Sequence, residues 1–267
     1  MRKKLLIVKL GGSVVTFKDS SKPKARINVI NRLTQEIKEV LDKKEYGLIL
    51  VHGAGSFGHP LAKKYNLSKG MKTQDQKLGF GLTTQKMIDL NSIIVSSLLK
   101  NGVPAVGLPP RAFITQSSGK LISFDHSQIK SFVEQNIVPV IFGDAVLDEQ
   151  WNCSIISGDT IIPYLAKKLK TDKVIFLSDV DGIFDSDPKK NHKAKLIKEI
   201  NNKNFKEILN GLTATARDDV TGEMKGKIKA LQQSLKGLPV WIVNGLKEQT
   251  LQKAVKQVSI GTRLLLD

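Results

Sequence analysis

The sequence predicts an α/β fold, an αβα sandwich in which helices cover both faces of a predominantly parallel, open sheet. The first observation is that short apolar segments of strand length alternate with amphipathic helical segments almost throughout the chain. Such alternation favours parallel strands joined by crossover helices. The second is size: 267 residues with 40% hydrophobic content can bury a full core. We therefore expect one continuous domain with two lobes.

The amino-terminal lobe is expected to span residues 1–170. Apolar residues at three- and four-residue spacing indicate its helices, and continuous apolar runs indicate its strands. Asn101-Gly102 ends the longest helical pattern. The expected elements are a strand at 4–10, a helix at about 27–44, a strand at 47–51, a helix at 80–100, strands at 103–107 and 137–142, and a hairpin at 145–156 that turns near 148–150.

The carboxyl-terminal lobe, residues 171–267, is expected to start after a helix that ends near Lys170. The same two patterns identify its elements. They are a strand at 173–177, a helix at about 222–236, a strand at 240–243, a helix at 246–255 and a final strand at 262–266. The helix that precedes this lobe is expected at 159–169. In such sheets ligands bind beyond the carboxyl ends of the strands, where the polar loops of this chain lie.

The charge balance leaves a nucleic-acid-binding protein as one alternative, because the formal net charge is +17. However, only six of the basic residues are Arg, and the lysines are scattered without an aromatic platform beside them. A lysine-rich surface exposed to solvent explains this pattern, and a positive field also attracts small anionic substrates. Strongly salt-dependent binding to nucleic acid would favour the alternative.

The chain is expected to reside in the cytoplasm and to have no membrane span. Its longest apolar runs have strand length, and the apolar run after Met1-Arg-Lys-Lys is too short for a signal peptide. The single cysteine, Cys153, excludes an internal disulfide framework.

The most informative motif is the glycine-rich stretch from His52 to His59, which follows the second strand. Three glycines let the backbone approach an anion with its N–H groups. Read as Gly-x-Gly-x-x-Gly, the stretch matches a dinucleotide fingerprint and leaves an NAD-dependent oxidoreductase open. That fold places the loop after the first strand and an acidic residue about 20 positions on, whereas here Asp75 lies in an apparent loop. Read as a P-loop, it has His59-Pro60 where Lys-Ser/Thr should follow.

Other polar residues also stand where the predicted strands end. Lys9 precedes Gly11-Gly12-Ser13 and is either a surface lysine before a turn or a phosphate ligand. Lys18 lies in a polar stretch, 16–24, that is interpreted as a mobile loop. Asp159 opens a helix, either as its N-cap or as a carboxylate that orients two lysines.

The remaining candidates are less specific. Asp179 belongs to the acidic loop 178–182, which is either a simple turn or part of a nucleotide site. The segment from Gly222 to Lys227 enters a helix and is suited to a phosphate chain. His59 could cap or pack its helix, whereas His52 is interpreted as a hydrogen-bonding support rather than a catalyst. The sequence contains no Cys/His cluster of the kind that forms a zinc site.

Taken together, the motifs Lys9–Ser13, His52–His59, Ser157–Asp159, Ser178–Gly182 and Thr221–Lys227 resemble, in their order, the amino acid kinase superfamily. The resemblance covers about residues 4–266. Within that superfamily, Gly-Ser-Phe-Gly-His59 resembles the isopentenyl phosphate kinase family of archaeal type. The resemblance implies an amino acid kinase-like fold and transfer of a phosphoryl group from ATP to isopentenyl phosphate, with Mg²⁺ as a cofactor. It also implies a homodimer and a place in isoprenoid biosynthesis.

The resemblance further implies roles for individual residues. Lys9, Lys18 and Lys227 would stabilise the phosphates, His59 would bind the acceptor phosphate, and Asp159 would order the lysines. The 1–170 lobe would bind the acceptor and the 171–267 lobe the nucleotide. The implied ATP ligands are Lys9, Leu10, Gly11, Gly12, Ser13, Gly55, Asp179, Gly222 and Lys227, and the implied acceptor ligands are Ala54, Gly55, Gly58, His59 and Gly143.

One departure from the family pattern and two alternative kinases stay open. Glu223 stands where the family pattern usually has a second glycine, which bears on the backbone path near the ATP phosphates. Fosfomycin kinase, whose acceptor is a phosphonate, has a similar histidine-bearing loop and is the nearest alternative on the same scaffold. A uridylate kinase fits less well, because nothing places a nucleoside in the acceptor site.

Overall fold

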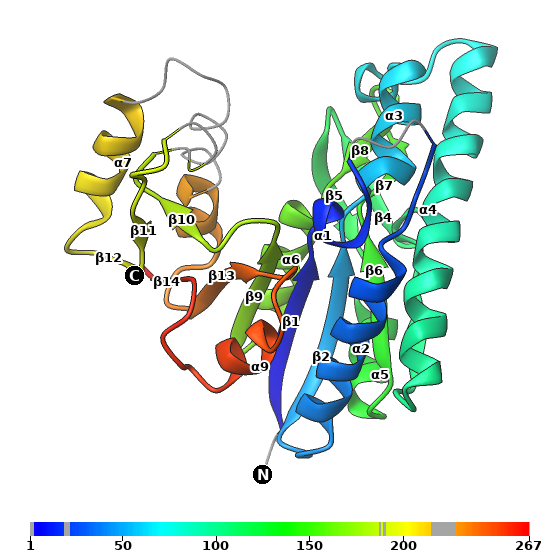
Figure 1. The fold of residues 1–267 in the computed structure, drawn as a ribbon. Helices are drawn as coiled ribbons and strands as arrows, with labels where there is room; N and C mark the ends of the chain where they lie inside the picture. Colours follow the sequence, from blue (N-terminus) through cyan, green and yellow to red (C-terminus); the bar gives the residue numbers. More distant parts are fainter. Residues whose placement is uncertain (1–2, 19–21, 187, 189–190, 215–227, 267) are drawn as a thin grey trace.

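A central sheet with helices on both faces organises the molecule (Figure 1). The computed structural model describes residues 3–18, 22–186, 188, 191–214 and 228–266. The sheet has eight strands in the order β12-β14-β13-β9-β1-β2-β6-β3. These strands are β1 (Lys4–Leu10), β2 (Tyr46–His52), β3 (Ala105–Gly107), β6 (Val138–Phe142), β9 (Lys173–Ser178), β12 (Glu199–Asn201), β13 (Val240–Asn244) and β14 (Thr262–Leu265).

The six strands from β13 to β3 are parallel, so their carboxyl ends meet at one edge of the sheet. Leu10 at the end of β1 is opposite His52 of β2 and Leu177 of β9. His52 is in turn opposite Phe142 of β6. Only at the β13–β14 boundary does the direction reverse, where the pairing is antiparallel. The predicted αβα sandwich with a predominantly parallel open sheet is confirmed.

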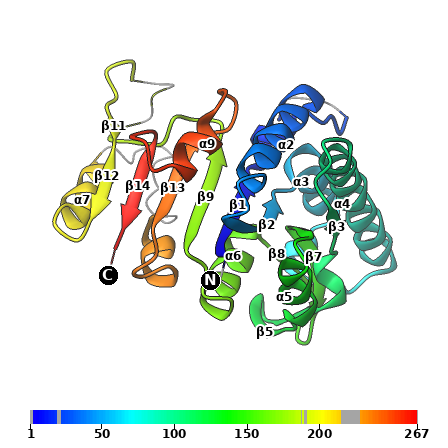
Figure 2. The ribbon, with the colours of Figure 1, turned by 90° about the horizontal axis from the view of Figure 1, so that it is seen from below.

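Helices cover the two faces of the sheet in separate layers (Figure 2). One layer holds the long helices with apolar faces at Leu33, Ile37 and Ile94, which pack on the side of the sheet that Leu6 and Leu50 face. The opposite layer packs Ile161 and Leu165 against Ile7 and Ile49. The helices are α1 (Gly12–Val15), α2 (Ile27–Leu41), α3 (Gly55–Lys64), α4 (Gln74–Lys100), α5 (Ser127–Glu134), α6 (Gly158–Lys168), α7 (Phe205–Ala214) and α9 (Thr250–Val255), with short turns η1 (Leu67–Lys69) and η2 (Pro110–Ala112).

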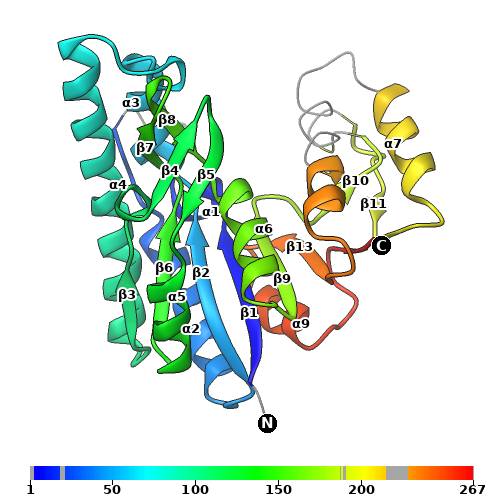
Figure 3. The same cartoon turned by 180° about the vertical axis from the view of Figure 1, so that it is seen from behind.

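A second sheet, β5-β4-β7-β8, stands beside α4 at the carboxyl end of β6 (Figure 3). It contains the predicted hairpin, formed by β7 and β8 with the turn between them. Its other pair was not predicted, because those strands are short and partly exposed. The bounds are β4 (Ile114–Ser117), β5 (Lys120–Phe124), β7 (Asp144–Asp148) and β8 (Asn152–Ile156), and a separate small pair comprises β10 (Ile183–Phe184) and β11 (Leu196–Ile197).

Several predicted bounds were wrong for local reasons. The long helix begins at Gln74 rather than Phe80, because Thr73 and Gln76 form a capping box there. Asp75 therefore lies in the first turn of a helix and not in a loop. Helix α9 begins at Thr250, later than the predicted 246, because 244–249 forms a hydrogen-bonded turn.

Another predicted helix extends into a gap in the described chain. The predicted helix at 222–236 is helical at 228–234, and its start lies outside the described residues. Among the described residues, no helix is both long enough and apolar enough to cross a membrane.

Two glycines of α4 give a matched test of its packing. A Cβ atom at Gly79 would lie 2.2 Å from Cγ of Tyr65, whereas one at Gly81 would have nothing within 4 Å. Gly79→Ala should therefore lower the free energy of unfolding by about 1–3 kcal/mol, since the buried tyrosine must move. Gly81→Ala should raise it by about 0.5–1 kcal/mol through helix propensity. Urea unfolding of both variants checks this, and equal stabilities would contradict the packing described.

Candidate active site

The loops that follow β1, β2, β6 and β9 converge at the carboxyl edge of the sheet (Figure 1). The loops after β1, β2 and β6 and the start of α6 line a cavity of about 200 Å³. Its lining combines polar groups and glycines with apolar side chains. The polar groups and glycines are Lys9, Gly12, Gly53, Gly58, His59, Thr83, Gly143, Asp144, Ser157, Gly158 and Asp159, and the apolar residues are Ala54, Ala62, Met87, Ala145, Ile155 and Ile156.

The loops after β1 and β2 touch through their backbones. A Cβ atom at Gly12 would lie 2.6 Å from the amide nitrogen of Gly55, and one at Gly53 would lie 2.7 Å from the nitrogen of Gly12. Gly55 also has a φ of +49°, in the left-handed region that favours glycine. No other residue fits at these positions without moving a backbone, so the glycines set the distance between the two loops.

Thr16 ties these loops together. Its side chain is fully buried, and its hydroxyl donates to the carbonyl oxygen of Gly12 at 2.7 Å. The same hydroxyl oxygen accepts from the amide of Ser56 at 3.0 Å. Thr16 also forms a bridge with Ala25, so the interpretation of 16–24 as a mobile loop is wrong for its ends. Sequence reasoning missed Thr16, because both of its partners come from backbone groups that no motif specifies.

Lys9 and Asp159 form an ion pair in the lining of the cavity. Nζ of Lys9 lies 2.7 Å from Oδ1 of Asp159 and also over the ring of Phe176. Asp159 occupies the first turn of α6, whose N-cap is Ser157, so the N-cap interpretation of Asp159 is wrong. The carboxylate instead faces a lysine, and the amino end of α6 adds a favourable dipole for an anion.

His59 lies in α3 and lines the same cavity. Its pKa is lowered mainly by burial and further by the nearby positive charge of Lys18. Both effects favour the neutral imidazole in the protein without ligand. An anion that entered the cavity would raise this pKa again, since an opposite charge favours the protonated form. His59 could therefore bind an anion in this cavity, and its protonation would then depend on whether the anion is bound.

His52 contacts the backbone of the glycine-rich loop that follows it. It is fully buried, its ring stacks on Phe142, and burial lowers its pKa to about 4. Nδ1 lies 3.1 Å from the carbonyl oxygen of Gly53, and Nε2 lies 3.2 Å from Nδ2 of Asn91. A neutral ring that donates from Nδ1 and accepts at Nε2 satisfies both contacts. His52 thus holds the backbone of the loop, as its interpretation as a hydrogen-bonding support predicts.

The loop after β9 carries two carboxylates with different partners. Oδ2 of Asp179 lies 3.5 Å from Nζ of Lys18, whose side chain is 62% exposed. Asp181 accepts instead from Nδ2 of Asn244 at 2.9 Å and from Nζ of Lys247 at 2.8 Å. Lys18 therefore contacts the loop after β9 and is also close enough to His59 to affect its pKa. The structure brings these three predicted residues, Lys18, Asp179 and His59, to one region.

The other predicted ATP ligands are distributed around the loop after β1. Leu10 has its side chain in the core, and its carbonyl oxygen accepts from the amide of Gly53. Gly11 donates its amide to the carbonyl oxygen of Leu177, and Ser13 lies in α1. Gly222, Glu223 and Lys227 lie outside the described residues.

Gly58 and Gly143, two of the predicted acceptor ligands, line the cavity, together with a residue that sequence reasoning missed. A Cβ atom at Gly58 would lie 2.8 Å from Sδ of Met87, and Gly143 donates its amide to the carbonyl oxygen of His52. Asp144, also in the cavity lining, is buried and pairs with Nη1 of Arg111 at 2.8 Å. Burial raises the pKa of Asp144 to about 6. In the sequence, only the position of Asp144 directly after Gly143 indicated that it belongs to the site.

Side chains of His, Cys, Asp and Glu do not gather in groups of three that could hold a metal ion anywhere in the described ranges.

Comparison with known proteins agrees with this geometry. Residues 4–244 match the model of the amino acid kinase family. The chain is 37% identical to an isopentenyl phosphate kinase of Methanothermobacter thermautotrophicus, over 97% of this chain and 98% of that protein. It is 38% identical to an isopentenyl phosphate kinase of Methanocaldococcus jannaschii, with the same coverage of 97% and 98%. A solved isopentenyl phosphate kinase superposes with a TM-score of 0.82 at 34% identity, over 97% of this chain and 99% of that one. The chain therefore belongs to the amino acid kinase family and, within it, to the isopentenyl phosphate kinases.

Proposed function

We propose that this kinase transfers the γ-phosphoryl group of ATP to isopentenyl phosphate and forms isopentenyl diphosphate, a step of isoprenoid biosynthesis. The observation that carries the proposal is the mixed lining of the cavity. Lys9, His59 and the backbone at Ala54 suit a phosphate, and Met87 and Ile156 suit a short hydrocarbon tail. A ligand with a phosphate and an apolar tail matches both kinds of lining group.

The reaction requires positioning and charge neutralisation rather than a general base. The acceptor is a phosphate monoester, which is largely deprotonated near neutral pH and can attack directly. Two anions must nevertheless approach each other in line. In the proposed complex His59 binds the acceptor phosphate, and Lys9, oriented by Asp159, stabilises negative charge at the phosphates. Lys18 neutralises charge on the transferred group.

The nucleotide is proposed to bind between the loop after β1 and the carboxyl-terminal lobe. Gly11, Gly12 and Ser13 would face its phosphates, and Asp179 its nucleoside. Lys227 and Gly222 are proposed as further ligands from the segment outside the described residues. On this view the 1–170 lobe binds the acceptor and the 171–267 lobe binds ATP.

Mg²⁺ is proposed to accompany ATP. Both carboxylates of the cavity lining are already paired, Asp159 with Lys9 and Asp144 with Arg111, so phosphate oxygens and water would supply most of the ligands, as is common for this ion. When bound, Mg²⁺ would neutralise charge on the β- and γ-phosphates. We further propose a homodimer that acts in the cytoplasm.

Turnover with isopentenyl phosphate tests the function directly. ADP release, followed in a coupled assay, should depend on both ATP and isopentenyl phosphate and should yield isopentenyl diphosphate, identified by mass spectrometry. Fosfomycin and uridine monophosphate serve as competing acceptors on the same scaffold. Turnover with either of them, and none with isopentenyl phosphate, would overturn the proposed substrate.

Substitution of His59 should weaken acceptor binding in a pH-dependent manner. His59→Ala removes a charge-assisted hydrogen bond and should raise KM for isopentenyl phosphate about 10- to 100-fold. His59→Gln keeps a neutral donor. The protonated imidazole binds the dianion better, so the ratio of the His59→Gln Kd to the wild-type Kd should rise as pH falls from about 8 to 6. Titration calorimetry measures this ratio, in which the ionisation of the substrate cancels. A ratio independent of pH would show that His59 stays neutral when it binds.

The hydroxyl of Thr16 should matter for kcat. Thr16→Val keeps the volume of the side chain but leaves the amide of Ser56 and the carbonyl of Gly12 without this partner. The glycine loops should shift, and kcat at saturating substrates should fall about 10- to 100-fold, since small misplacements of reacting groups cost that much. Thr16→Ser, which retains the hydroxyl, is the control and should stay within about threefold of wild type. Wild-type kcat in Thr16→Val would contradict the role of the hydroxyl.

A further inference from the structure

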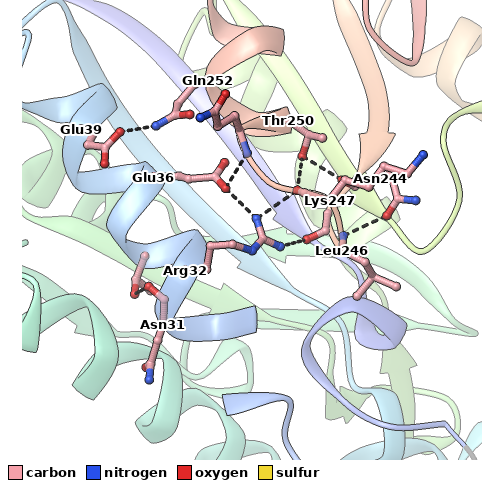
Figure 4. Close-up of polar contacts among 12 residues, drawn as sticks. Asn31, Arg32, Glu36, Glu39, Asn244, Leu246, Lys247, Thr250 and Gln252 are labelled. Carbon is pink, nitrogen blue, oxygen red and sulfur yellow. Dashed lines mark hydrogen bonds and ion pairs between the residues drawn. The ribbon is translucent and has the colours of Figure 1, made fainter. Parts of the chain in front are cut away.

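Arg32 connects α2 to the turn that follows β13 (Figure 4). Its Nη2 donates to the carbonyl oxygen of Gly245 at 2.6 Å, and its Nη1 donates to the carbonyl oxygen of Lys247 at 3.0 Å. The two residues are more than 200 positions away from Arg32 in the sequence. One guanidinium therefore joins the helical layer beside β1 to the carboxyl-terminal lobe.

Glu36, one turn further along α2, completes the connection. Its Oε1 accepts from Nη1 of Arg32 at 2.6 Å and from the amide of Gln249 at 3.0 Å. The side chain is only 6% exposed, so the arginine offsets the cost of burying this carboxylate. A second contact joins α2 to α9, which follows the turn: Gln252 donates to Glu39 (Figure 4).

The turn held by Arg32 carries the nucleotide-side loop. Gly245 donates its amide to the carbonyl oxygen of Ser178 at 2.8 Å. Asn244 and Lys247 both bind Asp181, three residues beyond Ser178. These three contacts join the turn 244–249 to the loop 178–182, which also contains Asp179.

The same turn packs against the loop after β1. A Cβ atom at Gly245 would lie 2.9 Å from Cγ1 of Val14, which belongs to α1 directly after Gly11-Gly12-Ser13. The turn therefore touches both segments between which the nucleotide is proposed to bind. A displacement of the turn would change the distance between them.

We propose that Arg32 is a positioning residue for ATP: it fixes the turn 244–249 and thereby sets the 178–182 loop against the loop after β1. The proposal rests on the proposed function, since it assigns ATP to this place. Arg32 itself does not touch the cavity that is assigned to the acceptor. Its loss should accordingly weaken ATP binding much more than acceptor binding.

The geometry requires arginine rather than any cation. Two carbonyl oxygens and one carboxylate oxygen are met by a planar group with donors in fixed directions. A lysine at this position would keep the charge beside Glu36 but could not meet both carbonyls in the same way. Arg32→Lys should therefore fold and show an intermediate defect.

The test measures Kd for ATP and Kd for isopentenyl phosphate separately by titration calorimetry, for Arg32→Met and Arg32→Lys. We expect Arg32→Met to raise Kd for ATP at least tenfold and Arg32→Lys about three- to fivefold. Kd for isopentenyl phosphate should change less than twofold in both. Should Arg32→Met not fold, Arg32→Lys alone decides, by the same comparison of the two ligands.

Lys38→Met is the matched control, because Lys38 of α2 forms an ion pair with Asp42, the C-cap residue of the same helix, and neither residue belongs to the turn 244–249. It should leave both Kd values unchanged. An unchanged Kd for ATP in the folded Arg32 variants, or an equal loss for both ligands, would overturn the proposal. Because ATP binding is measured without acceptor, failure here is distinct from failure of isopentenyl phosphate as the substrate, which would appear in the wild-type protein.

Discussion

The active site depends on one steric constraint, the backbone contact between the loops after β1 and β2. Gly12 and Gly55 approach so closely that a Cβ atom at Gly12 would lie 2.6 Å from the nitrogen of Gly55. Two parallel neighbouring strands bring the loops to the same edge, and the glycines then let them touch. Thr16 fixes the contact by hydrogen bonds to both sides. Two phosphates held by these loops would meet with little freedom, which is what an in-line transfer needs.

The lysines near this contact are paired with carboxylates. Lys9 is paired with Asp159 at the end of β1, and the more exposed Lys18 with Asp179. His59 differs from both lysines, because burial and the charge of Lys18 lower its pKa and favour its neutral form. The net charge of +17 attracts anions to the whole surface, but these local pairs give the site its geometry.

The sequence was sufficient for what depends on local pattern and insufficient for what depends on contacts across the chain. The strand that ends at Lys9-Leu10 and the loop that ends at His59 follow from apolar runs and glycines, so their meeting at one edge was predictable. Thr16 and Arg32 were not, because their partners are backbone groups that any residue can supply. Asp144 was missed for a similar reason, since its partner Arg111 belongs to an element with no periodic pattern. The amino acid kinase resemblance supplied the roles that pattern alone left open.

The most direct measurement is a crystal structure of the protein with isopentenyl phosphate and a non-hydrolysable ATP analogue. The account predicts the two phosphate groups on either side of the Gly12–Gly55 contact, with the acceptor phosphate in hydrogen-bond distance of His59 and the hydrocarbon tail beside Met87. An acceptor phosphate bound away from His59, or loops that separate so that Gly12 and Gly55 no longer touch, would contradict it.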